Sequence, residues 1–277
     1  MGAVLAARVT RLATLVALAV IIGVGISELY FAVTGWTQSD AGAYWNAGMR
    51  LREGQPLYPI VKDVEASDVY RYAPWFAWLA VPFTYLPVGL AGAIWSLILV
   101  AASVAAVVPL ARHGSWAQVA FFFPILIGIS AYGNVQALMV ASLVWSVDRS
   151  SGPVWIGAAA SLKIFPILFA LTYVGRRQWL RAAIAVAVAA LLWSPAVLFD
   201  LRGYVTEAGQ AGLLGWAVGY YLLAAAAAVV AVWFARGRFG WLASAIAVVL
   251  AAPRFFIYDL TYLMVGTGER SDARPLR

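Results

Sequence analysis

The chain has 277 residues, of which 64% are hydrophobic and only 11% are charged, and its formal net charge is +7. Soluble domains carry about 25% charged residues, so the composition excludes a soluble domain, and the positive balance indicates arginines in short loops rather than a surface for nucleic acid. The absence of cysteine excludes disulfides and thiolate metal sites, and a single histidine excludes a histidine-based cluster, so we expect neither a metal site nor a cofactor.

Apolar runs recur along the chain, most of them approaching the ~20 residues that a helix needs to cross a bilayer. Backbone polar groups cannot stay unpaired in hydrocarbon, so these runs must be helices. We therefore predict an all-α fold, a polytopic transmembrane bundle of about ten helices that forms one integral membrane domain over residues 1–277.

The first predicted helix lies within residues 1–33. Arg8 and Arg11 precede an apolar run over residues 12–33. The run is longer than a signal peptide needs and ends without a small-x-small cleavage site. We expect an uncleaved first transmembrane helix with its N-terminus in the cytoplasm.

A polar segment follows, and we predict that residues 34–73 form an extracytoplasmic loop. Within it, residues 41–53 place aromatic side chains such as Tyr44 mainly on one side and charged ones such as Arg50 on the other. This pattern is typical of a helix lying along the membrane interface. Gly54 is the expected stop signal.

Asp40 stands directly before this interfacial helix. Aspartate caps helices well, so one interpretation is an N-cap. The other is chemical, because a lone carboxylate at a membrane face, followed by aromatic and basic residues, is a candidate for catalysis. The residues alone leave both interpretations open.

Transmembrane helices are predicted across residues 74–266, with a cytoplasmic tail over 267–277. The apolar segments are 74–86, 88–110, 115–131, 134–148, 152–174, 180–198, 213–235, 240–252 and 255–266. Strict alternation from a cytoplasmic N-terminus puts Asp40 and Arg254 on the same outer side. The arginines expected inside are Arg176, Arg177, Arg181, Arg236 and Arg238, and those expected in outer loops are Arg112, Arg149 and Arg202.

Polar residues within the apolar segments are expensive and therefore candidates for function. Lys163 lies in the middle of its segment, and Pro166 interrupts the helix just after it. Lys163 could be a buried, paired lysine or a cation that meets a lipid phosphate. Residues 132–136 (YGNVQ) break another apolar run, where a structural role in a helix break or in close packing is favoured.

Arg254 and Tyr258 are four residues apart and share a helical face. Arginine binds phosphate with two parallel hydrogen bonds, which lysine cannot match. Arg254 at the outer interface is therefore either a phosphate clamp or a plain interfacial anchor.

Several short motifs, in this order and spacing, resemble glycosyltransferase family 87. They are Asp40 with Tyr44, residues 54–58 (GQPLY), 70–74 (YRYAP), Gly133-Asn134, 161–166 (SLKIFP) and 252–259, which begins APR and ends YD. The family usually runs well beyond 277 residues and often has histidine where this chain has Tyr258. We therefore expect a shortened member or a fragment.

The resemblance implies a membrane enzyme of the GT-C type. Such an enzyme transfers mannose or a related sugar from a polyprenyl phosphate to an extracytoplasmic glycolipid or lipoglycan, with inversion at the sugar. Asp40 would be the general base. The donor phosphate would be held by Arg254, then Lys163 and Arg71, and the sugar and lipid would be framed by Tyr44, Trp45, Tyr72 and Tyr258.

Two other classes of function remain possible. A polyprenyl-lipid transporter or flippase could use a similar cavity, although the chain lacks a clear internal repeat, which such proteins often show. A non-catalytic subunit of an envelope-glycan synthesis complex would suit the short length. Assays of transfer against translocation, and the glycolipid profile of an Asp40→Asn strain, discriminate between these classes.

Overall fold

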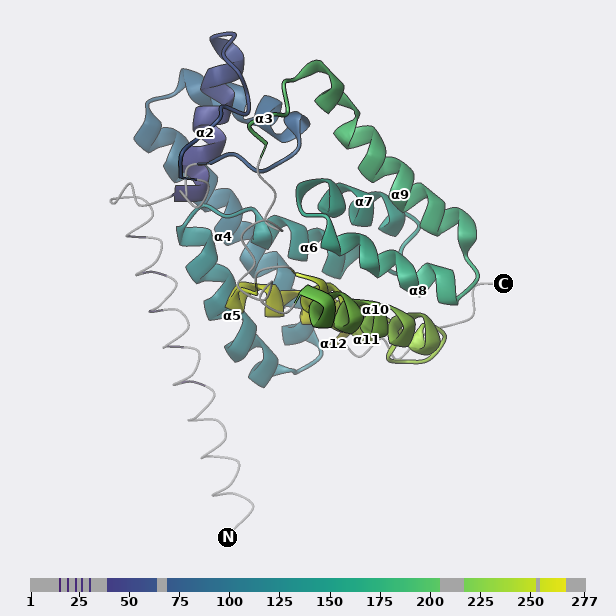
Figure 1. The fold of residues 1–277 in the computed structure, drawn as a ribbon. Coiled ribbons are helices and arrows are strands. Elements are labelled where there is room, and N and C mark those ends of the chain that lie inside the picture. Colours follow the sequence, from purple (N-terminus) through teal and green to yellow (C-terminus); the bar gives the residue numbers. More distant parts are fainter. Residues whose placement is uncertain are drawn as a thin grey trace.

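The computed structural model describes residues 39–63, 69–204, 217–252 and 255–267, together with positions 15, 19, 23, 26 and 30 of the first apolar segment. The described part is helical, with eleven α-helices joined by turns and short 3₁₀ helices (Figure 1), and no strand occurs in it. The all-α fold class is thus confirmed, while the GT-C arrangement of the helices stays a prediction.

The helix predicted over residues 41–53 is present as α2 (Ser39–Arg52), and Gly54 follows it with a φ of 67°. α2 packs on the short helix α3 (Pro74–Ala80) and the 3₁₀ helix η1 (Val81–Tyr85). Figure 1 shows α2 and α3 lying together beside the start of the bundle. Arg52 links α2 to η1, because its Nη1 donates a hydrogen bond to the carbonyl oxygen of Thr84 at 2.8 Å.

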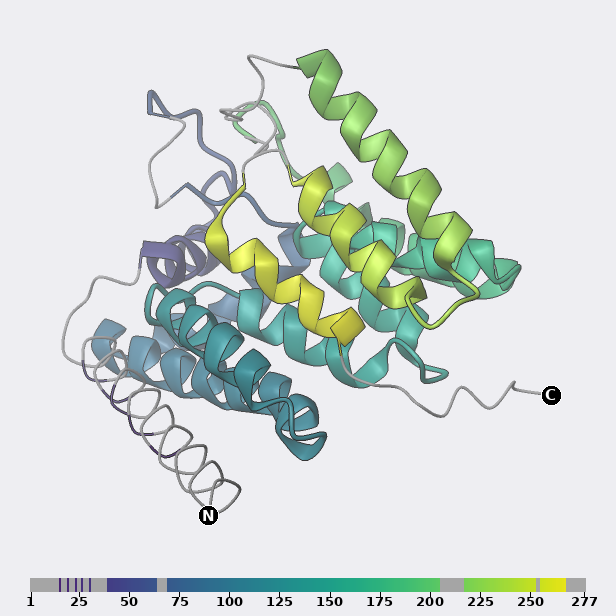
Figure 2. The same ribbon diagram turned by 90° about the horizontal axis from the view of Figure 1, so that it is seen from below.

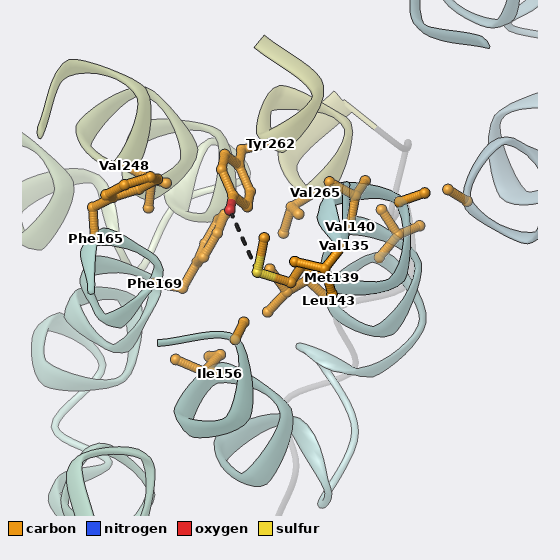
Figure 3. Close-up of a cluster of buried hydrophobic side chains, with 14 of the residues drawn as sticks. Val135, Met139, Val140, Leu143, Ile156, Phe165, Phe169, Val248, Tyr262 and Val265 are labelled. Atoms are coloured by element: carbon orange, nitrogen blue, oxygen red, sulfur yellow. Dashed lines mark hydrogen bonds between the residues drawn. The ribbon is translucent and has the colours of Figure 1, made fainter. Parts of the chain in front are cut away.

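The first half of the bundle consists of α4 (Val88–Arg112), α5 (Trp116–Ala131) and α6 (Gln136–Ser146). α4 packs against both α5 and α6. α6 is the centre of the core, since apolar side chains bury around it from both halves of the molecule (Figure 3). Met139 on α6 accepts a hydrogen bond from the hydroxyl of Tyr262, which comes from near the C-terminus.

The second half packs around that centre. Its helices are α7 (Gly152–Leu162), η2 (Phe165–Phe169), α8 (Ala170–Gly175), α9 (Trp179–Trp193), η3 (Ser194–Leu198), α10 (Ala217–Phe234), α11 (Gly240–Ala251), η6 (Ile257–Leu263) and α12 (Met264–Thr267). α7 packs on α9 and α10 on α11, and Figure 2 shows α4 and α5 on one side of the molecule and α10 on the other.

Three predicted segments differ from the structure. Residues 74–86 form only α3 and η1, which are too short to cross a bilayer as one helix. Residues 152–174 are two helical arms, because the chain is extended at Lys163 and η2 begins at Phe165, next to Pro166. Residues 255–266 hold the 3₁₀ helix η6 and one turn of α-helix rather than an apolar α-helix.

These differences correct the predicted placement of two arginines. Arg112 and Arg149 both lie over the ring of Trp145, at 5.7 and 5.6 Å, so they share one end of the bundle. Arg181 donates to the carbonyl oxygen of Arg149 and therefore lies at that end too, not opposite it. The alternation was wrong here because it counted 74–86 as a crossing and 152–174 as a single one.

We call this the arginine end of the bundle, defined by Arg112, Arg149, Arg176, Arg181 and Arg236. The opposite polar end is defined by Asp40, Asn134, Lys163 and Tyr258. Two helices of the described part, Val88–Arg112 and Trp179–Leu198, are long and apolar enough to cross a membrane, and six shorter apolar helices accompany them.

Candidate active site

Asp40 lies in the first turn of α2, half-buried, and the turn after α5 holds it there. Its backbone N–H donates to the carbonyl oxygen of Tyr132 at 3.1 Å. Asn134 Nδ2 donates to Asp40 Oδ2 at 3.0 Å. A carboxylate in the first turn also benefits from the positive end of the helix dipole. Because α2 begins at Ser39, Asp40 lies inside the helix rather than at a cap before it.

Gly133 makes this close approach possible. Its φ is 80°, and a Cβ built on it would lie 2.5 Å from the Cβ of Ala41 and 2.8 Å from the Ala41 backbone nitrogen. Trp95 fixes the same turn from α4, with its Nε1 donating to the Gly133 carbonyl oxygen at 2.7 Å. A side chain at position 133 would push α2 away from the turn that holds Asp40.

A hydrogen-bonded chain leads from Asp40 across the polar end. Asn134, buried to 4% exposure, accepts a hydrogen bond on Oδ1 from the backbone N–H of Gln136 at 2.9 Å. The Gln136 side chain donates to Thr261 Oγ1 at 3.1 Å and to the carbonyl oxygen of Tyr258 at 3.4 Å. The contacts of Gln136 join the α5–α6 turn to η6. The hydrogen bond to Asn134 Oδ1 orients the Asn134 amide so that its Nδ2 faces Asp40.

Lys163 reaches the same region from the break between α7 and η2. It is 5% exposed, and its Nζ lies 3.4 Å from the Tyr258 hydroxyl and 4.6 Å from the centre of the Tyr258 ring. The structure thus links two predicted site residues, Lys163 and Tyr258, and joins them to Asp40 through Gln136 and Asn134.

Aromatic side chains pack beside Asp40. The hydroxyl of Tyr44 donates to that of Tyr72 at 3.1 Å, and their rings meet edge to face. Burial raises the pKa of Tyr44 well above its usual value, and the charge of Asp40 raises it further, against the smaller opposing effect of hydrogen bonds with Tyr72 and Val135. Tyr44 is therefore neutral and acts as a hydrogen-bond donor beside Asp40.

A cavity of about 800 Å³ opens next to this cluster. Side chains of α2, α3, η1, α4, α6 and α7 line it, and nearly all are apolar, including Trp45, Trp75, Trp95 and Trp155. Its lining on α4 runs from Ala91 to Ala105, and fourteen residues of helix correspond to ~20 Å. It begins at Ala41, next to Asp40, and reaches Leu162, next to Lys163.

Two tryptophans in the cavity wall differ in the partners of their indole N–H groups. Trp75 Nε1 donates to Ser161 Oγ at 3.0 Å, which fixes its ring. Trp45 Nε1 is buried and has no hydrogen-bond partner among the described residues. It is thus a donor for which the described part of the protein supplies no acceptor, in the wall of a cavity large enough for a ligand.

The remaining predicted site residues are less closely tied to Asp40. Arg71 donates through Nη1 to the carbonyl oxygen of Val69 at 3.3 Å, and its own carbonyl oxygen accepts a hydrogen bond from Tyr204 at 3.5 Å. Arg254 lies outside the described residues. The sequence analysis treated Asn134 and Gln136 mainly as a helix break; the signal that could have marked them is two amides, one residue apart from each other, inside an apolar run.

Comparison with known proteins supports the sequence resemblance. The model of Glycosyltransferase family 87 matches residues 70–200. The chain is 26% identical over 234 residues, 76% of its length and 53% of the relative's, to a polyprenol-phosphate-mannose-dependent alpha-(1-2)-phosphatidylinositol pentamannoside mannosyltransferase of Mycobacterium tuberculosis. It is 26% identical over 163 residues, 53% of its length and 36% of the relative's, to GPI mannosyltransferase 1 of Gibberella zeae.

No solved structure matches the chain significantly. The chain spans about half the length of the first of these relatives and about a third of the second. The apolar helices and the relatedness to these glycosyltransferases agree in placing it at a membrane. The family pattern over residues 70–200 and the similarity to two mannosyltransferases thus show that the chain is similar to the mannosyltransferases of Glycosyltransferase family 87.

Proposed function

We propose that this chain is a membrane glycosyltransferase that moves a sugar, with mannose as our first choice, from a polyprenyl phosphate to a glycolipid or lipoglycan. The observation that carries the proposal is the position of Asp40, held by Asn134 directly beside Ala41, where a large apolar cavity begins. The similarity to named mannosyltransferases favours transfer over lipid translocation or a purely structural subunit.

In the proposed reaction Asp40 is the general base. Its carboxylate accepts the proton of the acceptor hydroxyl, and the acceptor oxygen forms a bond to C1 of the sugar. The C1–O bond to the phosphate breaks as the new bond forms, so the configuration at C1 inverts. The bonding electrons leave with the polyprenyl phosphate, which needs a neighbouring cation more than a general acid.

Lys163 is the described residue best suited to hold that phosphate. It lies buried at the polar end, and Leu162 before it lines the cavity. A buried ammonium group balances the developing charge strongly, because the surrounding dielectric constant is low. Arg254 and Arg71 remain proposed partners in this role, and Tyr44, Trp45, Tyr72 and Tyr258 frame the sugar and the lipid.

The cavity itself suits a polyprenyl chain. Its walls are almost entirely apolar, and its ~20 Å along α4 runs from the polar end past the middle of that helix. An isoprenoid tail buried there would gain the transfer free energy of its apolar surface.

The distribution of arginines supports the proposed orientation. Short cytoplasmic loops of membrane proteins are rich in arginine and lysine. In the proposed orientation the arginine end is therefore cytoplasmic. Asp40 lies at the extracytoplasmic end, where the donor and the acceptor lipid bind.

Incubation of the purified chain with several polyprenyl-phosphate sugars and a membrane lipid extract, followed by mass analysis, tests the proposal. We expect a new hexose-bearing lipid from polyprenyl-phosphate mannose, and none from the Asp40→Asn variant. Translocation of the donor in sealed vesicles without any product would instead indicate a flippase. A glycolipid profile that changes on deletion of the protein but not with Asp40→Asn would indicate a non-catalytic subunit.

A further inference from the structure

A second apolar groove lies on the side of the bundle formed by α8 and α9, away from the proposed donor cavity. Its volume is about 600 Å³, and the residues that line it are Ile167, Leu168, Ala170, Leu171, Val174, Trp179, Ala182, Ala183, Val186 and Ala187. Its lining residues lie along both helices and reach the arginine end at Val174 and Trp179. The proposed transfer reaction does not use this groove.

Arg177 lies at the mouth of the groove, in the turn between Val174 and Trp179. It has a φ of 59°, the left-handed conformation that glycine normally supplies. The backbone forms a Schellman motif, in which the N–H of Gln178 donates to the carbonyl oxygen of Tyr173 at 2.8 Å and that of Arg177 to Val174 at 2.9 Å. An arginine at this position is held against its backbone preference, and such strain points to a function for the side chain.

The guanidinium groups of the neighbouring arginines contact other parts of the fold, in contrast to that of Arg177. Arg176 donates to the carbonyl oxygen of Ala235, and Arg236 donates to that of Gly175. Arg181 lies over the ring of Tyr173 at 4.5 Å. Arg177 is exposed, and within the described part of the chain its guanidinium makes no hydrogen bond or ion pair.

An apolar groove with an unengaged guanidinium at one end matches an amphiphile with an apolar tail and an anionic head. Trp179 at the same mouth is 62% exposed, as is typical of tryptophan at a membrane interface. The first turn of α9 adds the positive end of its helix dipole. Arginine is also the side chain best shaped to hold a phosphate through two hydrogen bonds.

We propose that this groove binds an anionic glycerophospholipid from the leaflet at the arginine end. One acyl chain lies between α8 and α9, and the Arg177 guanidinium holds the phosphodiester. The site is separate from the proposed donor site at the polar end, and it does not depend on the transfer activity.

The test measures binding of phosphatidylglycerol and of phosphatidylcholine with the same acyl chains to the full purified chain in neutral detergent, by native mass spectrometry. We expect phosphatidylglycerol to bind more tightly. Arg177→Gly should weaken its binding about tenfold, as expected for the loss of a charge-assisted hydrogen bond. It should not lower the melting temperature without lipid, because glycine suits the left-handed backbone.

Arg238→Ala is the matched control. Arg238 is also exposed at the arginine end and lies over the ring of Phe239 at 4.5 Å, outside the groove. It should leave the affinity for phosphatidylglycerol unchanged. Ala183→Phe, which fills the groove at an exposed lining position, should weaken binding while leaving Arg177 in place.

Equal affinity for the two phospholipids would overturn the proposal, as would an Arg177→Gly variant that binds phosphatidylglycerol like the unmodified chain. Unchanged binding by Ala183→Phe would show that the groove does not hold the acyl chain and would also contradict it. Displacement of the phospholipid by polyprenyl phosphate at equal concentration would identify the groove as a donor site instead.

Discussion

At the scale of single residues, two amides and one lysine decide whether Asp40 can act as a base. Asn134 donates to the carboxylate and is itself fixed by the Gln136 backbone. Lys163 supplies a buried positive charge near Tyr258. The sequence motifs marked Asp40 and Lys163, but they could not show that Asn134 donates to Asp40, because that hydrogen bond joins residues 94 positions apart.

Replacing Asn134 with alanine should impair the chemical step more than binding. Asp40 would keep its charge but lose the hydrogen bond that orients it, so we expect kcat to fall roughly 10- to 100-fold with little change in KM. Steady-state kinetics with polyprenyl-phosphate mannose measure both constants. Gln118→Ala, an amide in the first turn of α5 near the opposite end, is the control and should leave kcat unchanged. Loss of donor binding in Asn134→Ala would contradict a positioning role.

Lys163→Gln should have the opposite pattern. Glutamine keeps a polar group near the Tyr258 hydroxyl but removes the charge, so we expect KM for the donor to rise about tenfold or more. Lys62→Gln provides a matched control, because Lys62 is the chain's other lysine and is exposed. An unchanged KM in Lys163→Gln would assign the phosphate to a different cation.

At the scale of elements, the site depends on how α2 packs on the turn after α5. The sequence predicted α2 and its stop at Gly54, since both are local signals of pattern and glycine placement. It did not predict the hairpin at Lys163 or the 3₁₀ form of η6. Hydropathy alone cannot distinguish one long apolar helix from two short ones, because both fragments of a broken helix keep the same composition.

Two glycines with positive φ allow the cost of backbone strain to be measured separately from the cost of a steric clash between elements. Gly133→Ala and Gly54→Ala both place alanine at a left-handed position, at φ values of 80° and 67°. Only Gly133 faces another element, so its variant should lose ~1–3 kcal/mol more stability than Gly54→Ala, the cost typical of overpacking. Thermal unfolding in detergent measures the difference, and equal losses would mean that α2 tolerates the displacement.

At the scale of the whole molecule, the bundle has two chemically different ends. The alternation of predicted membrane crossings placed Asp40 at the end opposite Arg176 and Arg181, although it miscounted the crossings in two segments. The two errors cancelled, because the uncrossed segment 74–86 and the extra turn at Lys163 each reverse the direction of the chain once. The separation of the ends therefore rests on contacts such as that between Arg181 and Arg149.

The orientation of these ends can be measured directly because the chain has no cysteine. Glu53→Cys is exposed beside the polar end, and Arg238→Cys is exposed at the arginine end. A membrane-impermeant maleimide added to intact cells should label the first and not the second, as the enrichment of arginine in cytoplasmic loops requires. The reverse labelling would place Asp40 in the cytoplasm and contradict the proposed donor side.

The central claim is that Asp40 is the base for sugar transfer, and its most direct test combines two readings on the Asp40→Asn variant. Asparagine is nearly isosteric with aspartate but cannot accept the proton. The account predicts that the transfer rate from polyprenyl-phosphate mannose falls by about 10²–10⁴-fold while the Kd of the donor stays close to that of the unmodified chain. Transfer at an undiminished rate by Asp40→Asn would contradict the account.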